Sequence, residues 1–256
     1  MNRNIKLIIE YDGSRYHGWQ RQKGKVTIQS VLEECISKIT SEKNRLISAG
    51  RTDAGVHSLG QVATFRTDTS HAPHVFKRAL NSLLPPDIRI IDASEVAPDF
   101  HPRFSAKAKS YLYFICIEER PPVFIANYCW PVKKTLDLEA MKEASLHIVG
   151  THDFSGFRAS GCGARTKVRT IYELKIETQK RIPFLGTEFE NEFIVIRVTG
   201  NAFLRYMVRN IVGTLVETGM GKRPAHSIKQ ILEQADRRLA GITAPAKGLF
   251  LERVYY

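Results

Sequence analysis

The order in which strand-like and helix-like patterns alternate constrains the fold most. The clearest helix follows Thr27, a good capping residue, and its apolar side chains recur at helical spacing as far as Ile39. Strands and a second helix surround it. The expected segments are strand 5–11, helix 28–39, strands 45–49 and 60–66, a helix from Pro73 to Pro85, and strand 87–93. This order predicts a split β-α-β unit with helices on one face of an antiparallel sheet.

The second half repeats this rhythm less regularly. Residues 111–117 are apolar on both alternating faces, which is typical of a buried, central strand. The later expected segments are a helix capped by Asp137, strands 170–178 and 192–199 joined by an irregular stretch around Pro183 and Gly186, helix 202–218, a short helix around 228–232, and strand 248–255.

The best domain boundary lies at 98–105. We therefore predict an α+β fold with two ferredoxin-like or RRM-like halves, residues 1–104 and 105–256. The halves are expected to share a continuous, mostly antiparallel sheet. Helices would pack on one face of that sheet, and the active-site cleft would lie on the other.

The charge balance indicates the kind of partner. The chain has 256 residues, 43% of them hydrophobic, and a formal net charge of +12. A field of this sign attracts polyanions, so nucleic acid is the first candidate partner and an anionic membrane surface the second. No apolar run reaches the length of about 18 to 20 residues that a spanning helix needs.

The cysteines and the N-terminus bear on the compartment. Cys35, Cys116, Cys129 and Cys162 are scattered, without a C-x-x-C pair or a histidine at zinc-ligand spacing. They are expected to be free thiols, three of them half or fully buried. The first residues have no signal-peptide layout. We therefore expect a cytoplasmic protein.

The segment 49–58, AGRTDAGVHS, is the main candidate for chemistry. Asp53 lies between Gly50 and Gly55, on a tight turn between two expected strands, where another backbone or a ligand can approach closely. A lone aspartate can act as nucleophile, general base or metal ligand. The cation of Arg51 would favour the ionised, nucleophilic form. A solvated turn is the plain alternative.

Two loops are candidates for phosphate contact. Residues 14–26 interleave basic and aromatic side chains, among them Arg15 and Arg21, although Trp19 itself is better explained as a core residue. The segment 153–172 gathers positive charge beside glycines and has no acidic residue after its first position. Its basic residues are Arg158, Arg165, Lys167 and Arg169. Ordinary solvated loops are the alternative.

Two further features lie in the second half. Arg205 and Arg209 are one turn apart on the expected helix 202–218, at the margin of its apolar face, where an arginine could pair with Asp53 or form a structural salt bridge. Tyr111 begins the expected buried strand. If strand order brought it beside Asp53, ring and carboxylate would form a pocket for a flat base. Core packing is the commoner role of such a tyrosine.

These pieces together resemble the tRNA pseudouridine synthase A family over nearly the whole chain. The matching motifs are YDG at 11–13 with GWQRQ at 18–22, AGRTDAGVH at 49–57, YLY at 111–113, THDF at 151–154, MVRNIVG at 207–213 and GLFL at 248–251. The segment 151–169 is more individual than the others.

The resemblance implies isomerisation of uridine to pseudouridine at positions 38 to 40 of the tRNA anticodon stem-loop, without cofactor or metal. Asp53 would be the nucleophile and would attack either C6 of the uracil or C1′ of the ribose. Tyr111 would stack on the base, Arg209 would pair with Asp53, and Leu249 would line the pocket. A homodimer with one tRNA spanning both subunits is expected.

Two other functions fit the residues. A non-catalytic RNA-binding protein could use the same basic, aromatic-bearing surface. A metal-dependent nuclease could use Asp12, Asp53 and His57, although His57 lies on the expected hairpin tip and lacks the helical spacing of a ligand pair.

Overall fold

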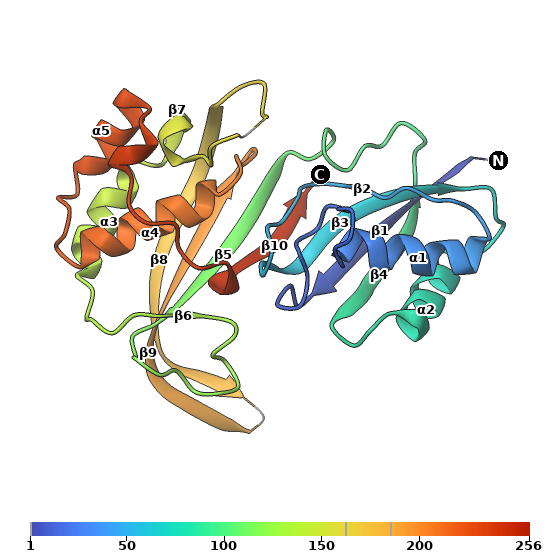
Figure 1. Ribbon diagram of the computed structural model, residues 1–256, viewed down its shortest axis with the longest axis horizontal. Coiled ribbons are helices and arrows are strands. Elements are labelled where there is room, and N and C mark those ends of the chain that lie inside the picture. Colours follow the sequence, from blue (N-terminus) through green and yellow to red (C-terminus); the bar gives the residue numbers. More distant parts are fainter. Residues whose placement is uncertain (1, 162, 185) are drawn as a thin grey trace. The chain divides into compact units, whose positions relative to one another are not determined.

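The computed structural model describes residues 2–161, 163–184 and 186–256. The chain forms two compact units (Figure 1). The first consists of Met1–Lys107 together with Phe250–Tyr256, and the second consists of Ala108–Leu249. Each unit has its own strands and its own helices. The closing residues of the chain thus return to the unit in which it begins.

The first unit follows the order β1, α1, β2, β3, α2, β4 and is completed by β10. The bounds are β1 Arg3–Tyr11, α1 Ile28–Thr40, β2 Ile47–Ser48, β3 His57–Thr67, α2 Pro73–Leu83, β4 Ile88–Val96 and β10 Leu249–Tyr255. The strand order is β4-β1-β3-β10, with β2 attached to β3. All pairs are antiparallel except β3 with β10, which run parallel.

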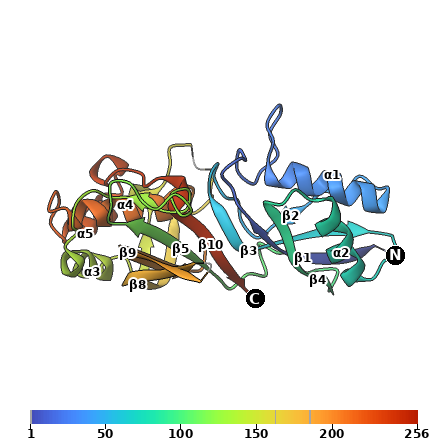
Figure 2. The ribbon, with the colours of Figure 1, turned by 90° about the horizontal axis from the view of Figure 1, so that it is seen from below.

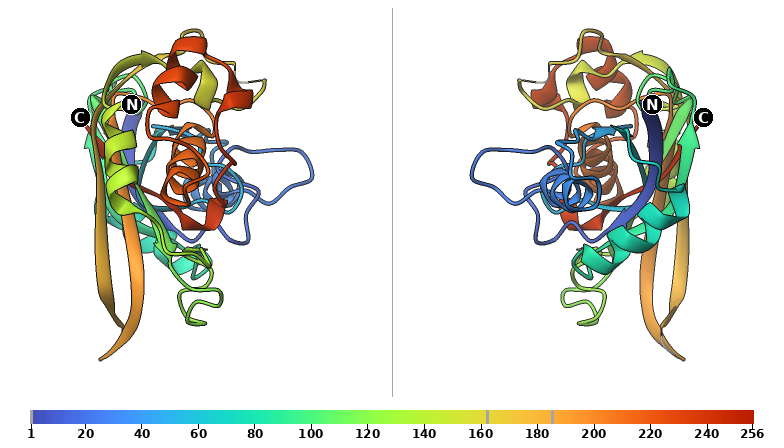
Figure 3. Two further views of the ribbon diagram at one scale, coloured as in Figure 1. Left: turned by 90° about the vertical axis from the view of Figure 1, so that its left-hand side faces the viewer. Right: turned by 90° about the vertical axis from the view of Figure 1, so that its right-hand side faces the viewer.

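Alternation along β1 builds the core of this unit. Ile5, Leu7, Ile9 and Tyr11 point to one face and are buried against α1 and α2. Thr27 caps α1 as predicted, because its hydroxyl accepts from the Ser30 amide. Both helices therefore cover the same face of the sheet. The loop that precedes α1 projects away from the unit (Figures 2 and 3).

The second unit has the strand order β5-β9-β8-β7, antiparallel throughout, and β6 runs parallel to β5. The bounds are β5 Ala108–Cys116, β6 Trp130–Pro131, α3 Leu138–Leu146, β7 Gly150–Asp153, β8 Val168–Phe184, β9 Thr187–Gly200, α4 Met207–Gly219 and α5 Ser227–Gln234. Short 3₁₀ turns lie at Ser155–Phe157, Arg237–Leu239 and Ala246–Gly248. Asp137 caps α3 as predicted, accepting from the Ala140 amide.

Two expectations about this unit are wrong. The stretch around Pro183 is a continuation of β8 and β9, not an irregular link. The last residue of β5, Cys116, is the end of its pairing with β9. Beyond that point β8 and β9 still pair with each other and form a two-stranded ribbon (Figures 1 and 3). A strand at the edge of a sheet tolerates proline because its outward side makes no ladder hydrogen bonds.

The helix expected over 202–218 begins only at Met207. Tyr206 has φ +64°, a left-handed conformation that cannot continue a right-handed helix backwards. Residues 202–205 instead form an irregular approach to α4, in which the ring of Phe203 packs edge-on against Tyr111 at 4.9 Å. Tertiary packing outweighs helical periodicity here.

The fold is thus mixed α and β with a mostly antiparallel ten-stranded sheet in the described part of the chain, as predicted at that level. Cys35, Cys116 and Cys129 are buried thiols, and Cys162 lies outside the described residues. Among the described residues, no helix has the length and apolar character that crossing a membrane requires.

Candidate active site

The loop that carries Asp53 joins β2 to β3 and spans residues 49–56. β2 pairs with β3 at Ile47 and Ser48, so the predicted hairpin exists, although its first strand is shorter than expected. The amide of Val56 donates to the Asp53 carbonyl at 3.1 Å. Gly55, with φ +77°, occupies the turn position that requires positive φ. Asp53 is half-buried at the start of this turn.

The segment after β1 lies against this loop. A Cβ atom on Gly13 would lie 2.0 Å from the Val56 carbonyl oxygen, and one on Gly18 would lie 2.6 Å from that of Thr52. Only glycine permits so close an approach. The Trp19 amide donates to the Thr52 carbonyl at 3.0 Å, and the Trp19 ring is buried, as the core interpretation predicts. The Asp53 loop is therefore held along one side.

A buried polar cluster holds the loop from beneath. The hydroxyls of Tyr11 and Thr52 form a hydrogen bond of 2.8 Å, and the Gln61 side-chain amide donates to the Gly50 carbonyl at 2.9 Å. All three side chains are less than 9% exposed. Burial raises the pKa of Tyr11 to about 12, so its hydroxyl stays protonated at neutral pH.

His57 follows the loop as the first residue of β3. Its ring is 1% exposed and stacks on Phe250 at 4.6 Å. Its Nδ1 lies 3.0 Å from a carboxylate oxygen of Asp12 and 3.1 Å from the Gly13 amide nitrogen. Among the described residues, no three or more histidine, cysteine, aspartate or glutamate side chains are arranged to hold a metal ion. The Asp12, Asp53 and His57 set of the nuclease interpretation therefore does not form a metal cluster.

The three residues to which the resemblance assigns roles beside Asp53 lie in the second unit. Tyr111 on β5 is buried, with its backbone paired to Val198. Leu249 is also buried, directly after a 3₁₀ turn. Arg209, near the start of α4, donates from Nε to the Ala244 carbonyl at 2.7 Å, while the Ala244 amide donates back to the Arg209 carbonyl. These two hydrogen bonds fix the Nε side of the Arg209 guanidinium against the Ala244 backbone.

Arg205 and Arg209 do not share a helix, because α4 begins after Arg205. The ring of Tyr206 brings them together instead. The guanidinium carbon of Arg205 lies 4.9 Å from the ring centroid and that of Arg209 lies 4.8 Å from it. Two cations on one ring make a positively charged cluster at the start of α4. Arg205 is exposed, and Arg209 is half-buried.

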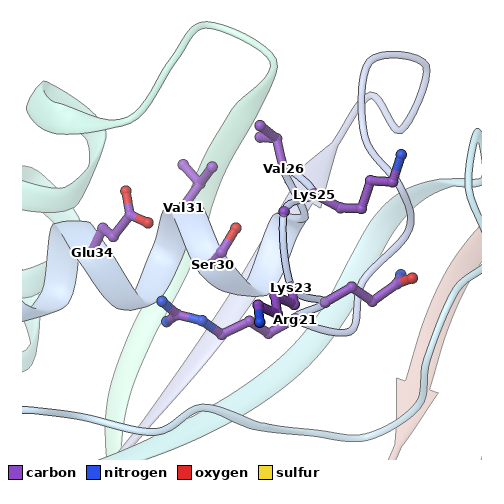
Figure 4. Close-up of a pocket in the computed structure, with 9 residues that line it drawn as sticks. Arg21, Lys23, Lys25, Val26, Ser30, Val31 and Glu34 are labelled. Atoms are coloured by element: carbon purple, nitrogen blue, oxygen red, sulfur yellow. The ribbon is translucent and has the colours of Figure 1, made fainter.

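The two arginines predicted before α1 are both ion-paired. Arg15 contacts Asp87 at 2.6 Å, and Arg21 contacts Glu33 at 3.0 Å. Arg21 also lines an open depression of about 540 Å³ beside α1 (Figure 4). The other lining residues are Gln22, Lys23, Gly24, Lys25, Val26, Ser30, Val31 and Glu34. The loop thus keeps a basic rim although two of its guanidiniums have carboxylate partners.

The basic residues of 153–172 lie after the 3₁₀ turn Ser155–Phe157, three of them before β8 and Arg169 on that strand. Arg165 is exposed, while Arg158 and Arg169 are half-buried. Arg169 donates to the Thr166 hydroxyl at 3.0 Å and to the Val168 carbonyl at 2.6 Å. Lys167 donates to the Ala164 carbonyl. The segment is therefore partly ordered by its own side chains.

The sequence reasoning missed the cluster beneath the loop. The sequence pattern predicts Tyr11 only as the end of one strand and Gln61 only as part of another. One signal could have indicated the cluster. A polar side chain at a strand position that faces inward needs a hydrogen-bond partner, because buried polar groups are almost always paired. Tyr206 was also missed, because nothing in a helical pattern marks one residue as left-handed.

Fold and site together define an α+β protein that presents one carboxylate on a glycine-bounded loop. The sequence matches the family described as tRNA pseudouridine synthase over residues 7–105 and 144–256. A protein named tRNA pseudouridine synthase A from Acetivibrio thermocellus is 48% identical over 254 residues, covering 99% of this chain and 100% of the relative. One of the same name from Thermoanaerobacter sp. is 45% identical with the same coverage.

These similarities extend over nearly the full length of both partners. The chain therefore belongs to the tRNA pseudouridine synthase family. As a member, it is an isomerase that converts uridine in tRNA to pseudouridine.

Proposed function

We propose that this chain modifies positions 38 to 40 in the anticodon stem-loop of tRNA, with Asp53 as the nucleophile. The observation that carries the proposal is the setting of Asp53. Its carboxylate starts a tight turn whose neighbours are held by hydrogen bonds from β1, β3 and the segment around Trp19. A group fixed in this way loses little orientational freedom when it reacts.

The proposed reaction begins when a carboxylate oxygen of Asp53 bonds to C6 of the uracil or to C1′ of the ribose. The N1–C1′ glycosidic bond breaks, the uracil rotates, and C5 bonds to C1′. The bond to Asp53 breaks, which restores the carboxylate, and C5 loses its proton while N1 gains one, which gives pseudouridine. Substrate and product have the same atoms, so the chemistry needs no oxidant or reductant.

The target uridine has to leave its stack to reach a half-buried carboxylate. Base flipping costs a few kcal/mol, and least in a loop or at a weak stem end. Contacts with the phosphate backbone supply the binding energy that offsets this cost. We assign them to Arg15, Arg21, Arg158, Arg165, Arg169 and Arg205. Arg15 and Arg21 would exchange a carboxylate partner for a phosphate on binding.

The remaining roles concern the base and the nucleophile. Tyr111 would stack on the flipped uracil, and Leu249 would pack beside it. Arg51 and Arg209 would favour the ionised carboxylate of Asp53. The reciprocal hydrogen bonds between Arg209 and Ala244 support a fixed position for this guanidinium within its own unit.

The architecture and the assembly are part of the same proposal. The order β4-β1-β3 with β2 beside β3 supports a ferredoxin-like arrangement of the first unit. We propose two such halves and a homodimer that binds one tRNA across both subunits. Light scattering during gel filtration measures the oligomeric state.

The cysteines bear on the location of the protein. Buried thiols without disulfide bonds at Cys35, Cys116 and Cys129 support our proposal of a cytoplasmic location.

The test is incubation with an unmodified tRNA transcript followed by chemical mapping of pseudouridine. Pseudouridine at position 38, 39 or 40 is the expected result. A transcript with cytidine at the mapped position is the control, and it should bind equally but remain unmodified. Binding without any modification would favour the non-catalytic RNA-binding alternative. Modification elsewhere in the tRNA would refute the anticodon assignment.

A further inference from the structure

The polar cluster beneath the Asp53 loop has no part in the reaction described above. It consists of Tyr11 from β1, Gln61 from β3, and the two loop groups that they contact, the Thr52 hydroxyl and the Gly50 carbonyl. Thr52 directly precedes Asp53. Two framework strands thus reach the loop on both sides of Arg51, through groups that touch no substrate atom in the proposed mechanism.

The strand that leads into the loop is short. β2 pairs with β3 only through Ile47 and Ser48, and residues 43–46 before it form no regular element. The Ala49 amide donates to the Val62 carbonyl at 2.8 Å, and there the ladder ends. Beyond Ala49, groups outside this ladder therefore have to fix the conformation of the loop.

We propose that Tyr11 and Gln61 are positioning residues that fix the orientation of the Asp53 carboxylate through Thr52 and Gly50. The inference rests on the proposed role of Asp53 as nucleophile. β1 and β3 are paired along most of their length, so both side chains extend from a rigid frame. Catalytic groups need positions accurate to about half an ångström, and rigid neighbours that support them provide this.

The chemistry of the cluster indicates positioning rather than core packing. The three side chains are buried, and a buried polar group that loses its partner is costly. Each of the two contacts would therefore resist displacement of the loop. Burial keeps the Tyr11 hydroxyl protonated, so the hydrogen bond to Thr52 persists throughout the neutral pH range.

The experiment removes single atoms from this cluster. Tyr11→Phe deletes the phenol oxygen, and Thr52→Val replaces the threonine hydroxyl by a methyl group of similar size. We expect each variant to lower the single-turnover rate with saturating tRNA by tenfold or more, while the Kd for tRNA changes less than threefold. Thr52→Ser keeps the hydroxyl and should retain most of the rate.

A double-mutant cycle tests whether the two hydroxyls act as a unit. Both substitutions break the same hydrogen bond, so the variant with both changes should be no slower than the slower single variant. The control is Tyr256→Phe, which removes a hydroxyl that donates to the Pro102 carbonyl at 2.9 Å in the same unit. This control should keep the wild-type rate within twofold.

Amide hydrogen exchange gives a second readout that does not depend on activity. Exchange at 49–56, including the Val56 amide that closes the turn, should become at least tenfold faster in Tyr11→Phe and in Gln61→Met. It should not change in Tyr256→Phe. Faster exchange throughout the unit would mean general destabilisation and would overturn the inference.

A wild-type rate in Tyr11→Phe, or equal losses of rate and tRNA affinity, would also overturn it. Failure of the proposed function looks different. In that case the wild-type chain itself makes no pseudouridine at positions 38 to 40, whatever the exchange measurements show.

Discussion

At the scale of single residues, the chemistry assigned to Asp53 depends on one carboxylate, carried by a loop that backbone groups and uncharged side chains hold on two sides. Gly13 and Gly18 allow the neighbouring segment to approach, and Tyr11 supports the loop from beneath. A carboxylate in this setting contributes reactivity more than binding, because its environment is arranged around one fixed position.

Replacing Asp53 tests that assignment. Asp53→Ala and Asp53→Asn should both abolish formation of pseudouridine, since neither retains a nucleophilic oxygen anion, while tRNA affinity stays within about tenfold of wild type. Chemical mapping and filter binding measure the two effects. Asp99→Ala removes an exposed carboxylate of the same unit and should leave both unchanged. Turnover by Asp53→Ala would show that another group is the nucleophile.

Arg209 and Arg205 form a matched pair, because both guanidiniums lie over the Tyr206 ring. Arg209→Ala should lower turnover more than affinity, since a fixed charge that pairs with the nucleophile, as proposed, would act on the reaction. Arg205→Ala should mainly lower affinity, as expected of an exposed phosphate contact. Single-turnover rates and Kd values for both variants separate the two roles. A fall in affinity alone for Arg209→Ala would make Arg209 a phosphate contact.

At the scale of elements, the predicted helices and strands formed where local signals were complete. In α1 the cap at Thr27 and the apolar periodicity agree, and the helix has the predicted start. The helix over 202–218 is predicted from periodicity alone, and the prediction is wrong for its first residues, because the helix begins at Met207. The pattern continues through Phe203 and Leu204, but Tyr206 adopts a left-handed conformation that no pattern records.

The end of α1 offers a test of the same physics. Ser41 has φ +59° and donates its amide to the Ser37 carbonyl, so it occupies a position that favours glycine. Ser41→Gly should raise the free energy of unfolding by about 0.5 to 1 kcal/mol, the relief of left-handed strain less the added entropy of the unfolded chain. Urea denaturation measures the change.

The control for that substitution lies one turn earlier. Ser37→Gly introduces the same residue inside α1 and should lower stability by about 0.5 to 1 kcal/mol. Equal effects of the two substitutions would mean that the conformation of Ser41 carries no strain.

At the scale of the whole molecule, charge governs the encounter with tRNA. The net charge of +12 is spread over both units, and the arginines proposed to contact phosphates come from loops of each. Long-range attraction of this kind is independent of base sequence. It should therefore act on any tRNA, whereas the position of Asp53 selects the reaction.

Salt dependence measures this contribution. The logarithm of tRNA affinity should fall linearly with the logarithm of salt concentration, with a slope of about −4 to −5 if the proposed guanidiniums all contact phosphates. Arg165→Ala should make the slope shallower by about 1. The single-turnover rate at saturating tRNA should change much less. A flat salt profile would contradict the assignment of the basic loops.

Chelation tests the remaining alternative. Activity should persist after prolonged dialysis against EDTA, because the proposed chemistry involves only the Asp53 carboxylate and the target uridine. The tRNA should be refolded in monovalent salt, so that loss of its own magnesium does not mimic an effect on the protein. Restoration of lost activity by a divalent cation would favour a metal-dependent mechanism.

The sequence by itself determined the mixed α and β class, the main helices and strands, and the loop that carries Asp53. These depend on local signals, namely side-chain alternation, capping residues and glycines at a turn, which act over a few residues. The family motifs also lie in continuous stretches, so the match to known synthases needed no structure.

Only the tertiary structure decided which distant residues meet. Tyr11 and Gln61 lie 50 positions apart in the sequence, and pairing of β1 with β3 brings both to the underside of one loop. The return of residues 250–256 to the first unit, which places Phe250 on His57, is of the same kind. Such contacts depend on strand order and register, which are set by packing across the whole sheet and leave no local trace in the chain.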